Sequence, residues 1–189
     1  MKFIFLFCIL LSFVACKSHK TEPVSQPPVN DTAENYFPVT TYIKGQIADI
    51  KSASVNPLLI STTPEKTDSV WLGIDSLDYY FKDFLTPVID TANLKSHFSE
   101  SKFLDQSIPA YTWTYDIRKN VADTSGLKHW DVYVNPDNSK VERIFIIKTL
   151  PGNNILQLTW VSNNYARIIE LNTNSDIKKD VTIKWRFDK

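Results

Sequence analysis

The sequence predicts an α+β fold in which N-terminal helices pack on one face of a roughly six-stranded antiparallel meander sheet. Two observations support this prediction. Apolar residues recur every three or four positions before about Leu104, and they alternate with polar residues from Ile108 onward. Short polar turns separate the alternating segments, and that spacing is typical of an antiparallel meander. Strands and helices do not alternate along the chain, so a Rossmann-type parallel sheet is not indicated.

The helical part is predicted from the apolar period. Residues 38–52 carry one apolar stripe of Val39, Tyr42, Ile43, Ile47 and Ile50. A second helix is expected to begin near Asp75 or Ser76 and to end before Pro87. Residues 94–104 are expected to add a turn or two of helix, while 58–60 and 69–71 are short extended segments.

Six strands are predicted after residue 107, near residues 108–117, 130–134, 141–150, 156–160, 165–171 and 181–187. The run Ile144-Phe-Ile-Ile147 is apolar at consecutive positions. This indicates a central strand that is covered on both faces.

The N-terminus resembles the signal peptide of a bacterial lipoprotein. Met1 and Lys2 precede an apolar stretch of about a dozen residues, which is too short to span a membrane. The stretch ends Phe13-Val-Ala-Cys16, which is similar to a lipobox, although Phe13 stands where that family usually has Leu or Val. The resemblance implies cleavage after residue 15 and a lipid on Cys16, the membrane anchor. The alternative is an ordinary secretory signal in which Cys16 is incidental.

The remaining chain divides into a tether and a single domain. Residues 16–35 are polar and proline-rich, so they cannot bury enough apolar surface to fold and are predicted to be a flexible tether. Residues 36–189 are predicted to form one α+β globular domain. Lys17 follows the cysteine, which by resemblance to enteric lipoproteins implies sorting to the outer membrane.

Composition excludes several classes of function. Lys and Arg number 21, as do Asp and Glu, so no positive field for nucleic acid is present. Cys8 and Cys16 are the only cysteines, and His19, His97 and His129 form no closely spaced pair, so no metal site or cofactor is expected. No Gly-x-Ser-x-Gly elbow occurs either. The sequence therefore predicts a protein that is not an enzyme.

Aromatic residues of the alternating segments are the candidate ligand-binding residues. Stacked on one sheet face they could hold a sugar or an apolar molecule, but alternation predicts the same residues if they only fill the core. The sequence is compatible with both a ligand-binding surface and a core. The candidates are Tyr111, Trp113, Tyr115, Trp130 and Trp160.

The domain also resembles small uncharacterised lipoproteins of Bacteroidota, through residues 84–90, 103–116 and 127–134. That resemblance implies no activity and no functional residues. The anchor, the tether and the absence of catalytic motifs predict a non-catalytic envelope lipoprotein, a protein-interaction or envelope-maintenance module whose surface docks an envelope protein or the cell wall. The alternative is a small-ligand binding protein that uses an aromatic-lined sheet face.

Overall fold

The computed structural model describes residues 36–90, 94–119, 121 and 125–186. All of them belong to one compact unit, Asn35–Lys189. The predictions of a signal peptide, of lipid on Cys16 and of a tether lie outside the described residues. Within the described part of the chain, no helix is long and apolar enough to cross a membrane.

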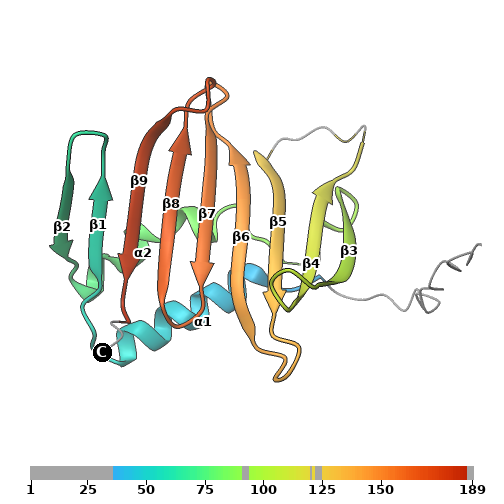
Figure 1. Ribbon diagram of the computed structural model, residues 1–189, viewed down its shortest axis with the longest axis horizontal. Coiled ribbons are helices and arrows are strands. Elements are labelled where there is room, and N and C mark those ends of the chain that lie inside the picture. The colour runs from blue at the N-terminus through green and yellow to red at the C-terminus, as the bar shows by residue number, and fades with distance from the viewer. Residues whose placement is uncertain (1–35, 91–93, 120, 122–124, 187–189) are drawn as a thin grey trace, which may run out of the picture. The chain divides into compact units, whose positions relative to one another are not determined.

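Nine strands form one open antiparallel sheet in the order β2-β1-β9-β8-β7-β6-β5-β4-β3 (Figure 1). The strands β3 to β9 follow one another as a meander, and the β1–β2 hairpin extends the sheet beyond β9. Their bounds are Leu58–Thr62 (β1), Thr67–Trp71 (β2), Phe98–Asp105 (β3), Ala110–Ile117 (β4), Leu127–Val134 (β5), Val141–Thr149 (β6), Ile155–Val161 (β7), Tyr165–Leu171 (β8) and Ile177–Lys184 (β9).

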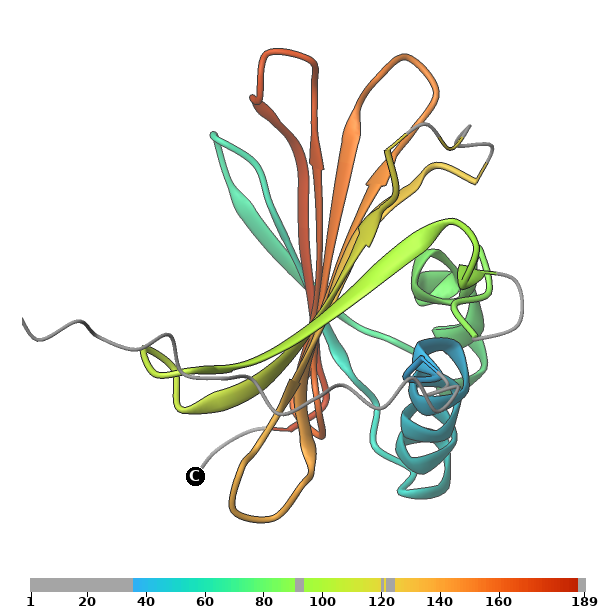
Figure 2. The ribbon, with the colours of Figure 1, turned by 90° about the vertical axis from the view of Figure 1, so that its right-hand side faces the viewer.

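Among the described residues, the helices are few and mostly short. The longest, α1 (Val39–Ser52), buries Val39, Ile43, Ile47 and Ile50. A 3-10 turn, η1 (Ile74–Ser76), leads into α2 (Leu77–Tyr80) and α3 (Lys82–Leu85). Figure 2 shows these helical segments on the same side of the sheet.

The predicted fold class is wrong, because the molecule is dominated by a nine-stranded open sheet rather than by helices on six strands. Two of the three additional strands, β1 and β2, coincide with the segments predicted to be extended at 58–60 and 69–71. Their place in the sheet was not predicted, because it depends on the pairing of Ile60 with Thr182, a contact too distant in sequence for local periodicity to reveal. The third, β3, occupies the region expected to be helical. Because β3 is an edge strand with most side chains exposed, it lacks the apolar alternation that identifies a half-buried strand.

The core lies between the helices and one face of the sheet. Trp160 packs against Phe81, which lies between α2 and α3, and against Phe84 of α3, with ring centroids 5.0 and 5.3 Å away. Ile144 and Ile146 of β6 are buried on this side. Phe145 alternates with them onto the opposite face and is only partly buried, so β6 is not the doubly covered strand that its sequence indicates.

Candidate functional site

The sheet face opposite the helices, here called the open face, carries the side chains that alternate with the core residues. Tyr115 and Trp130 are paired across β4 and β5 and fully buried, whereas their neighbours Asp116 and His129 are paired on the other side. Among the residues that the structure describes, no helix lies over this face (Figure 2). From β4 to β8 it consists of Thr112, Thr114, Asp116, His129, Asp131, Tyr133, Arg143, Phe145, Ile147, Gln157, Thr159, Val161, Tyr165, Arg167 and Ile169.

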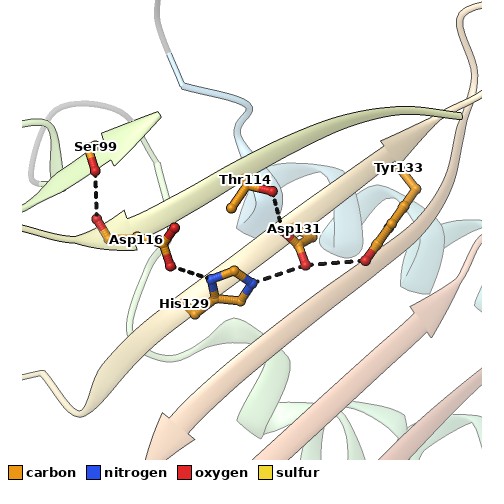
Figure 3. A network of polar contacts seen from close by, with 6 residues as sticks. All are labelled: Ser99, Thr114, Asp116, His129, Asp131 and Tyr133. Atoms are coloured by element: carbon orange, nitrogen blue, oxygen red, sulfur yellow. Dashed lines mark hydrogen bonds and ion pairs between the residues drawn. The ribbon is translucent and has the colours of Figure 1, made fainter. Parts of the chain in front are cut away.

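A polar cluster centred on His129 lies on the open face of β4 and β5 (Figure 3). The imidazole Nδ1 lies 2.7 Å from Oδ1 of Asp116, and Nε2 lies 3.0 Å from Oδ2 of Asp131. Asp131 also accepts hydrogen bonds from the hydroxyls of Thr114, at 2.6 Å, and Tyr133, at 3.2 Å. Period-two alternation places all five side chains on one face. They are therefore neighbours in space although two separate strands supply them.

The two carboxylates hold the imidazole in its charged form. The hydrogen bond to Asp131 is the main reason that the pKa of His129 is raised to about 9; burial opposes the rise and Asp116 adds to it. Burial by itself raises the pKa of Asp131, but hydrogen bonds from His129 and Thr114 outweigh burial and leave that pKa below its ordinary value. At neutral pH the cluster is an imidazolium between two carboxylates.

This arrangement suits a fixed charge better than acid–base chemistry. A general base needs a free lone pair and a pKa near the working pH. His129 uses both ring nitrogens as donors and titrates well above neutrality. In the described part of the chain, no group of three or more His, Cys, Asp or Glu side chains is arranged to hold a metal ion.

Arg143 lies beside this cluster and faces a shallow pocket. Its guanidinium carbon is 3.9 Å from the ring centroid of Tyr133, whose hydroxyl is bonded to Asp131. The pocket has a volume of about 280 Å³ and includes Tyr133, Arg143, Thr159 and Tyr165 in its lining. The His129 cluster thus positions Tyr133, and Tyr133 in turn supports the arginine.

The five aromatic residues singled out in the sequence do not form one surface. Tyr115, Trp130 and Trp160 are completely buried, and the first two stack with ring centroids 4.5 Å apart. Trp113 is partly buried against Phe37, with a centroid distance of 5.8 Å. Tyr111 is 46% exposed near one end of β4. Three of the five therefore fill the core beneath the helices and cannot contact a ligand in this conformation.

The residues of the open-face site were missed in the sequence. His129 was assigned no role there, and Asp131, Tyr133 and Arg143 were not considered as site residues. The signal that could have found them is the series His129, Asp131 and Tyr133, polar or amphipathic side chains at every second position of one strand. Their partners on β4 and β6 follow only from the strand register.

A scan against protein-family models, a search of curated proteins and a search of solved structures each found no match for this chain. Function is therefore inferred from the chain's own residues. The resemblances of the N-terminus and of the domain to bacterial lipoproteins stay expectations.

Proposed function

We propose that this chain is a non-catalytic lipoprotein of the cell envelope whose open sheet face docks a partner protein. The observation that carries this proposal is the asymmetry of the sheet. One face is filled by the helices and the core, and the other presents ordered polar and aromatic side chains with no described helix over them. A large rigid sheet face of this kind is suited to a protein contact.

The predicted anchor supports the same reading. A lipid on Cys16 would hold the domain at a membrane, by resemblance the outer membrane, and the tether of residues 16–35 would let its open face reach a neighbour. Balanced charge favours a protein partner over nucleic acid, since nucleic-acid binding needs a concentrated basic surface.

The internal pairing of the open face supports a binding role. His129 is hydrogen-bonded to two carboxylates. Arg167 makes a bidentate contact with Asp180, with Nε 2.9 Å from Oδ1 and Nη2 2.6 Å from Oδ2. Charges that are already paired hold their side chains in fixed positions. A preordered surface loses less side-chain entropy when a partner binds.

Site-specific photo-crosslinking in intact cells tests the proposal. A photoreactive residue replaces Gln157 or Thr182 on the open face, and the matched control replaces Asp49 on the exposed side of α1. We expect one dominant crosslinked protein from both open-face positions, none from Asp49, and loss of the product in Cys16→Ser. Equal crosslinking from all three positions would contradict a docking face.

A second candidate function is the binding of a small ligand, and the pocket at Arg143 favours it. Aromatic walls with a few convergent polar groups are the usual composition of such sites. Tyr133 and Tyr165 contribute the aromatic surface, and Arg143 and Thr159 the polar groups. These are open-face residues rather than the aromatics predicted from the sequence.

A further inference from the structure

One row of residues that crosses four strands forms half of the lining of the pocket at Arg143, and Ile108, Ala110, Glu142 and Thr159 complete it. Strand register pairs Tyr133 with Arg143, Arg143 with Val161, and Val161 with Tyr165. The arginine therefore lies between two tyrosines on the same face of the sheet. Because the side chains come from four hydrogen-bonded strands, their spacing is fixed by the sheet rather than by a loop.

Among the described residues, Arg143 makes no direct ion pair, unlike Arg167, although the charge of Asp105 acts on it. Arg167 is held by both oxygens of Asp180. No carboxylate of the described residues lies within ion-pair distance of Arg143. Its guanidinium lies over the ring of Tyr133 and also interacts with the Tyr133 hydroxyl, and with five N–H donors it retains others for a ligand. A guanidinium edge matches a carboxylate, which it binds through two parallel hydrogen bonds.

The acidic side chains near the pocket are already engaged. Glu142 lines it and accepts a hydrogen bond from the side-chain amide of Asn135, at 2.7 Å. Asp105 accepts two bonds from Ser107, one from its N–H and one from its hydroxyl. Both carboxylates therefore already accept hydrogen bonds, and Asp105 also interacts with the charge of Arg143. The second oxygen of Glu142 remains a suitable acceptor for a ligand hydroxyl.

Size and wall chemistry narrow the ligand further. The volume of about 280 Å³ lies just below the roughly 300–1,000 Å³ that is usual for small-molecule sites, so the ligand can be no larger than a single ring. Tyr165 contributes an aromatic ring to the lining, and Thr159 contributes a hydroxyl that can donate or accept. Together with Arg143, these groups match a hydroxylated ring that carries a carboxylate.

We propose that this pocket binds a sugar acid, with the carboxylate on Arg143 and the ring against Tyr165. The inference rests on the second candidate function and names its ligand class. His129 and Asp131 are positioning residues in it, since they hold Tyr133 beneath the arginine without lining the pocket themselves.

Saturation-transfer NMR on the full chain in detergent tests this proposal, with glucuronate and galacturonate as probes and glucose and galactose as uncharged counterparts. We expect saturation transfer to either acid and binding of the neutral sugars that is at least about tenfold weaker, the usual effect of losing a charged hydrogen bond. Arg143→Gln should weaken binding of the acid by a similar factor. Arg167→Gln, the matched control, should leave it unchanged.

Three results would overturn the proposal: no transfer to either acid, equal binding of the neutral sugars, or undiminished binding in Arg143→Gln. Thr159→Val, which keeps the side-chain volume, gives an independent measurement if Arg143→Gln does not fold, and it should weaken binding several-fold. A neutral sugar that binds at this pocket would overturn the sugar-acid assignment and leave the second candidate function standing. The crosslinking experiment tests the docking proposal separately, so its result does not depend on the outcome of these NMR binding measurements.

Discussion

His129 and Asp131, two residues apart on β5, are joined by a contact of 3.0 Å between Nε2 and Oδ2. Successive side chains of a strand alternate between faces, so this spacing brings both onto the open face. Asp116 of β4 completes the pairing from the neighbouring strand. The Asp116–His129 contact links two strands on the side opposite the core, and the two carboxylates together fix the orientation of the imidazole.

The first prediction concerns the titration of His129. Its pKa should be about 9 rather than the ordinary 6.5, and Asp131→Asn should lower it more than Asp116→Asn because Asp131 is the stronger cause. The Asp116 side chain is 62% exposed, so solvent screens its contribution. Chemical shifts of the ring protons, followed from pH 5 to 10, measure both effects. A pKa near 6.5 in the wild type would rule out the paired imidazolium.

The second prediction is a pH-dependent loss of stability in His129→Gln. The pKa of His129 is higher in the folded chain, at about 9, than the ordinary 6.5. Its stabilisation is therefore complete below about pH 6.5 and is lost as the pH rises through about 9. Urea unfolding should show the wild type more stable by about 1–2 kcal/mol at pH 6, with a smaller difference at pH 10.

Lys148 also titrates between pH 6 and 10, so its effect on stability has to be distinguished from that of His129. Burial lowers the pKa of Lys148 to about 8. Its contribution has the opposite sign, because deprotonation relieves an unfavourable buried charge as the pH rises. Since Lys148 is present in both proteins, its effect cancels in their difference. A difference that does not change with pH would contradict the charge pairing of His129.

The third prediction separates core aromatics from exposed ones. Trp160 is completely buried, and its ring centroid lies 4.9 Å from that of Trp185. Trp160→Ala should lower the free energy of unfolding by about 3–5 kcal/mol. The matched control is Tyr111→Ala, at a position 46% exposed, and it should cost less than about 1 kcal/mol. Equal losses in denaturant unfolding would show that the two positions are not packed as described.

The fourth prediction concerns the buried amine of Lys148. It donates to the backbone carbonyls of Asp83 and Thr86, which joins β6 to the end of α3. Lys148→Met keeps most of the side-chain volume but leaves both carbonyls without this donor. We expect a loss of about 1–3 kcal/mol in the free energy of unfolding, against less than about 0.5 kcal/mol for Lys140→Met at an exposed position. No loss in Lys148→Met would show that water replaces the amine.

Local sequence patterns predict part of this fold. The apolar stripe from Val39 to Ile50 predicts α1 closely, and the alternation through Trp113 and Tyr115 predicts β4. Both signals exist because each segment buries one face. The strand β3 gives no such signal, since few of its side chains are buried, and β1 joins β9 through a pairing of residues more than a hundred positions apart.

The residues of the candidate site are harder to predict from the sequence than the fold. Trp130 and Trp160 are candidate ligand-binding residues from their aromatic character, but both are buried, and alternation alone does not show which face of a sheet the helices cover. The helices cover the aromatic face, so the polar residues between the aromatics face outward. His129 and Arg143 contribute to the site only through contacts with residues on neighbouring strands. The register between these strands cannot be predicted from a local sequence pattern.

Protection of the open face in the cell tests the central claim most directly. Cys8 and Cys16 are the only cysteines, the first in the predicted signal peptide and the second predicted to carry lipid, so a single new thiol can be labelled selectively. Gln157→Cys on the open face and Asp49→Cys on α1 are labelled with a maleimide, first in intact envelopes and then after purification in detergent. The proposed docking face predicts that Gln157→Cys is protected in the envelope and labelled once purified, while Asp49→Cys is labelled equally in both. Equal labelling of both positions in the envelope would contradict it.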